Sequence, residues 1–69
     1  MTELVFQVEE DPDGGYTARA VGESIFTEAE TIEELRRNIR DAVNCHFEDA
    51  ALRPKTVLLH FTRDEVIAL

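Results

Sequence analysis

The sequence predicts an α+β fold of the order β-β-β-α-β, arranged as a two-layer sandwich. Three short segments that alternate apolar and polar residues come first. One longer stretch then repeats its apolar residues at helical spacing, and a segment rich in β-forming residues follows Pro54. At 69 residues the chain is long enough for one domain, which we expect to span residues 1–69.

The first three segments are predicted to form a meander of strands. Residues 3–9 and 16–21 flank Asp-Pro-Asp-Gly-Gly at 11–15, where proline presets an early turn position and glycine supplies a positive φ. Residues 24–30 form the third strand, with Phe26 on its outer face. The residues predicted to share the inner faces are Leu4, Phe6, Val8, Tyr16, Ala18, Ala20, Ile25, Thr27 and Ala29.

A helix is predicted to begin at Thr31. The run Thr31-Ile32-Glu33-Glu34 has the form of a capping box, in which the Thr31 hydroxyl accepts from the Glu34 N–H and the Glu34 carboxylate reaches back to the Thr31 N–H. Pro54 forbids continuation, so the helix should end near residue 50 or 51. The apolar stripe contains Ile32, Leu35, Ile39, Ala42, Val43, His46 and Ala50.

The last part of the chain is predicted to form a fourth strand and a docking C-terminal tail. Residues 55–62 carry the run Val-Leu-Leu at 57–59, which puts apolar groups on both faces and predicts a central or covered strand. In residues 63–69, charges precede an apolar run that could add as a strand to a neighbour's sheet edge. The residues predicted to form an oligomer interface are Val66, Ile67 and Leu69.

The charge balance argues against direct nucleic-acid binding. The chain has 15 acidic and 7 basic residues, a net charge of −8, and a nucleic-acid backbone repels such a surface unless basic residues cluster. Arg36, Arg37 and Arg40 instead lie among acidic residues. The acidity favours either a basic protein partner or simple solubility.

The compartment and the oligomeric state follow from cysteine usage and size. A single cysteine, Cys45, is typical of a reducing compartment, and neither a signal peptide nor a membrane-spanning run is recognisable, so we expect a cytoplasmic protein without membrane contact. Small domains without disulfides often gain stability by association. We therefore expect a homodimer or a higher oligomer.

The stretch around the first turn does not fit a calcium loop. An EF-hand loop needs oxygen ligands at positions 1, 3 and 5, glycine at position 6 and glutamate at position 12. Counted from Asp11, position 5 is Gly15, position 6 is Tyr16 and position 12 is Gly22. The stretch is interpreted as a hairpin turn, and we expect neither a metal nor a cofactor.

No arrangement of catalytic residues is recognisable either. Cys45 and His46 are neighbours that point about 100° apart on a helix, so they cannot readily share a metal. A structural role at the helix end is the favoured interpretation for His46, and a cross-strand or interface role for His60. The acidic residues fall in turns and at the helix start, which are normally solvated, so we expect no enzyme activity.

Two motifs resemble those of the HicB-like antitoxin family, over roughly residues 3–62. The first is an Asp-Gly-Gly-Tyr-x-Ala type of turn, and the second is a polar run before a helix that opens with paired acids. The matching residues are Gly14, Gly15, Tyr16 and Ala18, then Thr27, Glu30, Thr31, Glu33 and Glu34. The chain departs from the family pattern at residues 21–26, where Pro-Gly-Cys is common, and at Ala29, where glycine is common. The closest resemblance is to the compact single-domain subgroup without a DNA-binding domain.

The resemblance implies a degenerate ribonuclease-H-like half-fold without catalysis. Its function would be to bind and neutralise a small basic mRNA-cleaving toxin (HicA-like) of a type II toxin–antitoxin system. The acidic residues expected to contact that partner are Glu9, Glu10, Asp11, Asp13, Glu28, Glu30, Glu33 and Glu34. Two alternatives remain open: an orphan self-assembling domain with a structural or small-molecule regulatory role, and a hydrolase that uses the clustered acids or Cys45.

Overall fold

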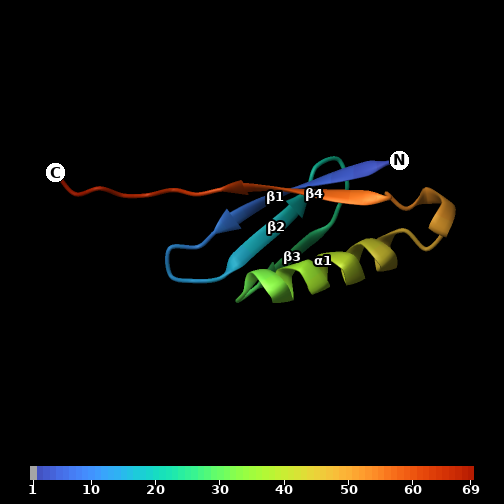
Figure 1. Cartoon of the computed structure of the whole chain (residues 1–69), viewed down its shortest axis with the longest axis horizontal. Helices are drawn as coiled ribbons and strands as arrows, with labels where there is room; N and C mark the ends of the chain where they lie inside the picture. The colour runs from blue at the N-terminus through green and yellow to red at the C-terminus, as the bar shows by residue number, and fades with distance from the viewer. Residues whose placement is uncertain (1) are drawn as a thin grey trace.

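The structure, a computed structural model, describes residues 2–69 and has the predicted α+β architecture (Figure 1). One helix lies along one side of a four-stranded sheet. The elements are β1 (Glu3–Glu10), β2 (Tyr16–Ala20), β3 (Phe26–Ala29), α1 (Ile32–His46), a short 3-10 turn η1 (Ala50–Leu52) and β4 (Thr56–Thr62). The β-β-β-α-β order is thus confirmed.

The sheet has the strand order β3-β2-β1-β4. The first three strands form an antiparallel meander, and β4 returns parallel to β1. β4 is therefore an edge strand, and the prediction of a central or covered strand was wrong. Val57 and Leu59 are half-buried on the helix side, whereas Leu58 on the other side is 48% exposed. Apolar residues on both faces of a strand do not show whether it has a neighbour on each edge, and within residues 2–69 β4 pairs only with β1.

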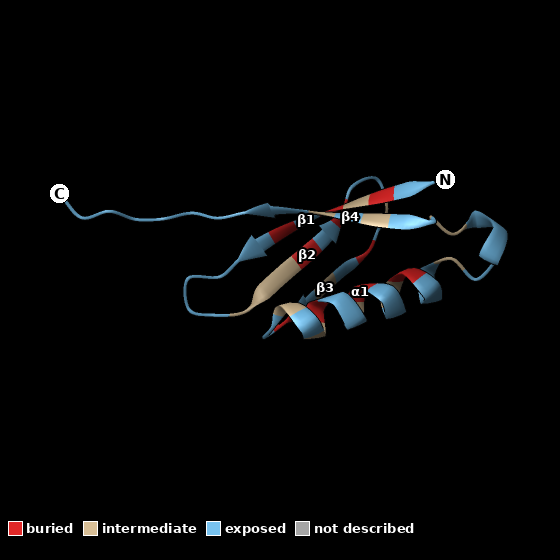
Figure 2. Ribbon diagram, in the orientation of Figure 1, coloured by how far each residue is buried: buried red, intermediate tan, exposed pale blue. Residues whose placement is uncertain are grey.

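The core lies between α1 and the helix-facing side of the sheet (Figure 2). Phe6, Val8 and Ala18 are fully buried there, as is Leu35 of the helix, so the predicted alternation in the first two strands is confirmed. Phe26 points to the open face, where the Arg19 guanidinium lies 5.8 Å from its ring centroid. The buried residues are Leu4, Phe6, Val8, Ala18, Ala20, Ile25, Ala29, Leu35, Ile39 and Val43.

The helix begins as predicted. Thr31 is the N-cap, and its hydroxyl accepts a hydrogen bond from the Glu34 N–H at 3.1 Å. The predicted reciprocal bond from the Thr31 N–H to the Glu34 carboxylate is not formed within residues 2–69. One half of the capping box is sufficient to satisfy one of the orphan donors at the helix start.

The helix ends at His46, four residues before the predicted end. The Arg53 side chain reaches back and donates from Nε to the Phe47 carbonyl at 2.7 Å, and from Nη2 towards the carbonyls of Asn44 and Glu48 at 3.5 and 3.4 Å. These carbonyls belong to the last turn and the residues after it, which have no helical partner. Asp49 then caps the 3-10 turn by accepting from the Ala51 N–H at 3.0 Å. The Arg53 side chain thus satisfies carbonyls at the helix end, which lies well before Pro54.

Residues 63–69, called the tail here, continue the line of β4 away from the body of the protein (Figure 1). Every residue of the tail is exposed, including Val66, Ile67 and Leu69. The predicted docking of the tail is thus not made within a single copy of the chain. Across residues 2–69, no helix has both the length and the apolar character needed to cross a membrane.

Candidate functional site

The turn between β1 and β2 is held by three local hydrogen bonds. The Asp11 Oδ1 accepts from the Asp13 N–H at 2.9 Å, and the Asp11 carbonyl accepts from the Gly14 N–H at 2.9 Å. The Asp11 N–H donates to the Gly15 carbonyl at 3.0 Å, which closes the loop. Gly14 and Gly15 adopt φ values of +102° and +91°, which side chains disfavour. The prediction of a hairpin turn is confirmed.

Gly15 brings this turn against the end of β3. A Cβ atom at Gly15 would lie 3.3 Å from the Ala29 carbonyl oxygen and 3.8 Å from Glu30 Oε2. The antiparallel pairing of Tyr16 with Ala29 places these segments side by side. The turn and the segment before the helix, which lie about 15 residues apart in the sequence, therefore form one surface.

Four acidic residues from these segments line one hollow of about 340 Å³. We call it the acidic hollow. It is lined by the backbone of the turn, by the first residues of β2, and by acids from the turn, from β3 and its end, and from the first turn of α1. The lining residues are Asp11, Gly14, Gly15, Tyr16, Thr17, Glu28, Ala29, Glu30 and Glu34.

The carboxylates of the acidic hollow have no cationic partner within residues 2–69. The one ion pair in this part of the chain joins His46 Nε2 to Glu23 Oε2 at 3.2 Å, near the other end of the helix. Glu34 lies in the first turn of α1, where the helix dipole favours a negative charge. A cationic group placed in the hollow would therefore meet acidic residues that no cation of the described chain already neutralises.

Half of the eight acids predicted to contact a partner gather at this hollow. Those that do are Asp11, Glu28, Glu30 and Glu34. Asp13 lies in the same turn but does not line the hollow, and Glu33 is exposed in the first turn of α1. Glu10 pairs with Tyr16 at the end of β1, and Glu9 lies one residue earlier, on the opposite face of the sheet. The sequence analysis thus found the acids but not which of them converge.

The residues considered for catalysis or metal binding are dispersed. Cys45 and His60 are both exposed, and His60 lies opposite Gln7 of β1. His46 pairs with Glu23 and contacts Phe47 edge-on, with ring centroids 4.9 Å apart, so its observed partner is a loop carboxylate instead of the helix carbonyls. In the described residues, no group of three or more His, Cys, Asp or Glu side chains is arranged to hold a metal ion.

A second, larger hollow escaped the sequence analysis. It has a volume of about 450 Å³, lies between α1 and β4, and gathers Arg36, Arg40 and Lys55 at its rim. In the sequence Arg36 and Arg40 lie among acidic residues, which conceals this grouping. The signal for them was the spacing of four residues along α1, beside Ile39 of the apolar stripe.

Comparisons with known proteins give two close relatives. The chain is 58% identical over 52 residues to a protein of Archaeoglobus fulgidus named "UPF0150 protein", covering 75% of this chain and 76% of the relative. It is 46% identical over 67 residues to a protein of Thermotoga maritima with the same name, covering 97% of this chain and 93% of the relative. No family model matches the chain, and no solved structure matches it.

Proposed function

The chain belongs to the UPF0150 family, and for it we propose the role of a non-catalytic, antitoxin-like protein of the cytoplasm. It binds a small basic toxin that cleaves mRNA and neutralises it, as one half of a type II toxin–antitoxin pair. The contact is made by the acidic hollow, which receives a Lys or Arg side chain of the toxin.

The observation that carries this proposal is the set of four acidic residues that line the hollow and have no cationic partner within residues 2–69. A carboxylate accepts bidentate hydrogen bonds from a guanidinium, and a partly enclosed site strengthens the attraction relative to open water. The net charge of −8 adds a long-range field that speeds the encounter with a basic protein.

The family resemblance supports the same surface. The first HicB-like motif contributes Gly14, Gly15 and Tyr16 to the lining of the hollow, and the second contributes Glu30 and Glu34. The two motifs lie apart in the sequence and meet at one place in the fold. Each also has a structural use, because the glycines make the turn and the second motif opens the helix.

The test is co-expression with the product of the neighbouring gene, followed by affinity measurement on the purified partners. The variant to compare with the native chain combines Glu28→Gln, Glu30→Gln and Glu34→Gln, which removes three charges from the hollow and keeps side-chain size. A control that combines Glu3→Gln, Asp41→Asn and Glu48→Gln removes the same three charges from exposed positions outside it.

The proposal predicts that affinity falls about tenfold or more in the hollow variant and much less in the control, since each exposed ion pair is worth roughly 0.2–1 kcal/mol. Equal losses would assign binding to net charge alone. Failure of the native chain to bind the product of a neighbouring gene for a small basic protein would count against the antitoxin role.

A second candidate function is an orphan self-assembling domain with a structural or small-molecule regulatory role. The exposed apolar residues of the tail and the open edge of β4 favour it. Recovery of homo-oligomers alone from the co-expression experiment would support this role in place of the first.

A further inference from the structure

The outer edge of β4 is a surface that a single copy leaves incomplete. β4 is seven residues long, pairs with β1 on one side, and has no strand on the other. Its side chains are apolar on the helix side, where Phe61 remains 48% exposed. An exposed apolar edge strand with unpaired backbone groups is an aggregation hazard unless another strand covers it.

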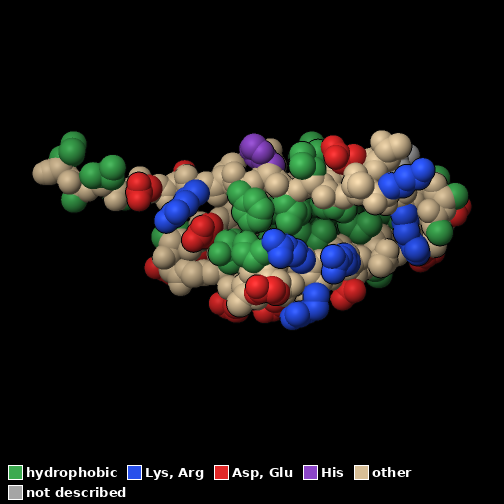
Figure 3. Space-filling view, viewed as in Figure 1, with side chains coloured by type: hydrophobic (Ala, Val, Ile, Leu, Met, Phe, Trp, Pro, Cys, Tyr) green, Lys and Arg blue, Asp and Glu red, His purple; other side chains and the backbone are tan. Residues whose placement is uncertain are grey.

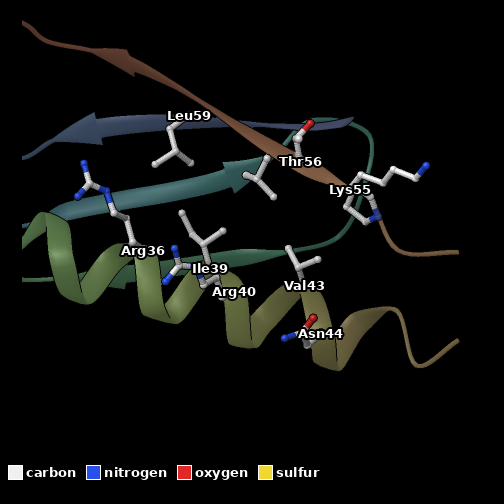
Figure 4. A pocket seen from close by; sticks show the side chains of 10 residues that line it. Arg36, Ile39, Arg40, Val43, Asn44, Lys55, Thr56 and Leu59 are labelled. Atoms are coloured by element: carbon white, nitrogen blue, oxygen red, sulfur yellow. The ribbon is translucent and has the colours of Figure 1, made fainter. Parts of the chain in front are cut away.

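The second hollow adjoins this edge. Between α1 and β4, Ile39, Val43, Val57 and Leu59 form an apolar floor. Figure 4 shows Arg36 rising from the helix towards Leu59, Arg40 beside Ile39, and Lys55 at the start of β4. In Figure 3 hydrophobic side chains fill a furrow along this face of the molecule, with Lys and Arg beside it. We call this surface the basic groove.

The tail has the complementary chemistry. It begins with Arg63, Asp64 and Glu65 and continues with Val66, Ile67 and Leu69, which are 95%, 73% and 118% exposed. It is extended and exposed along its whole length, so its backbone groups and side chains are available to a sheet edge. Arg63 and Glu65 carry opposite charges, so this part of the tail can pair with its own copy, and the apolar run matches the apolar floor of the basic groove.

We propose that the tail of a second copy pairs antiparallel with the open edge of β4, and that the exchange is reciprocal and forms a two-fold dimer. Alternate residues of a strand point to opposite faces, so one register places Glu65, Ile67 and Leu69 together on the groove side. Ile67 and Leu69 then lie opposite Phe61 and Leu59, and Glu65 lies opposite Arg63 of the other copy. Val66 and Ala68 face the other side of the sheet.

The occupant is a second copy and not the chain's own tail for a stereochemical reason. The tail leaves β4 in a straight line, and pairing with its own strand would need a tight reversal directly after Thr62. Residues 63–69 (RDEVIAL) contain neither glycine nor proline, nor the Asn-Gly or Asp-Gly pairs that such two-residue hairpins use. This inference does not depend on whether a toxin binds at the acidic hollow.

The test is the solution mass of the full chain by light scattering and sedimentation over a range of concentrations. Ile67→Asp and Val66→Asp form a matched pair, because they add the same charge to neighbouring residues on opposite faces of the tail. We expect a dimer for the native chain. Ile67→Asp should raise its dissociation constant about 100-fold or more, and Val66→Asp about tenfold at most, because only the first places a charge among apolar groups.

Amide hydrogen exchange reports on the edge itself. In the dimer the outward amides of β4 are protected, and in Ile67→Asp at the same concentration they exchange while the amides of the β1–β2 pair stay protected. That result also shows that the variant is folded. The proposal would be overturned if the native chain is a monomer, or if both substitutions weaken the dimer equally. It would also be overturned if the Ile67→Asp variant still forms a dimer in which the outward amides of β4 are protected.

Discussion

Substitution of Gly15 by alanine tests the contact that joins the first turn to β3. The chain adopts φ of +91° at Gly15 and +102° at Gly14, so alanine at either position costs about 1–2 kcal/mol in backbone strain. Only at Gly15 does the new Cβ also meet an atom, the Ala29 carbonyl oxygen at 3.3 Å, whereas nothing lies within 4 Å at Gly14. Crowding of a packed contact adds about 1 kcal/mol or more, so Gly15→Ala should cost about 2–4 kcal/mol.

Urea denaturation followed by circular dichroism measures both variants. With an m value of about 1 kcal/mol/M for a domain of this size, the midpoint of Gly15→Ala should lie about 1 M or more below that of Gly14→Ala. Gly14→Ala is the matched control because it carries the backbone strain without the contact. Equal midpoints for the two variants would refute the reasoning, because the approach of the turn to β3 would then impose no constraint.

Two further predictions concern the ends of α1. Thr31→Ala removes the side-chain oxygen that accepts from the Glu34 N–H and should lower the free energy of unfolding by about 1 kcal/mol; an unchanged denaturation midpoint would contradict the cap. Arg53→Met keeps the length of the side chain but leaves the carbonyls of Phe47 and Asn44 without this donor, and should cost about 1–2 kcal/mol. If Arg53→Met proves neutral in the same measurement, water replaces the guanidinium and the helix end is set by something else.

Local patterns predicted the parts of the fold whose cause is local. Alternation placed Phe6 and Val8 in the core, and the Thr31 cap marked the first residue of the helix. The helix end was missed because Arg53 satisfies the last carbonyls from outside the helix, and a side chain six residues past Phe47 carries no periodic signal. The edge position of β4 was missed because composition reports which faces are apolar and not which strand lies beside them.

The acidic hollow could be predicted in part from the sequence. In a three-stranded meander, the turn between the first two strands and the end of the third strand lie at the same end of the sheet, so Asp11 and Glu30 were bound to be neighbours. Asp13 and Glu33 do not line the hollow because of the detailed path of the turn and of the helix start. The spacing of residues in the sequence does not predict that path. The basic groove could not be predicted in the same way. Arg40 and Lys55 line one surface only because β4 lies beside α1 in the fold.

The most direct test of the proposed function is an NMR titration of the isotope-labelled chain with the purified small basic partner. The account predicts that the shifted amide signals concentrate in residues 11–17 and 28–34, around the acidic hollow. In the variant that combines Glu28→Gln, Glu30→Gln and Glu34→Gln, the same shifts should need about tenfold more partner or more to reach saturation. Shifts confined to the open face of the sheet or to the basic groove, with the hollow unaffected, would contradict it.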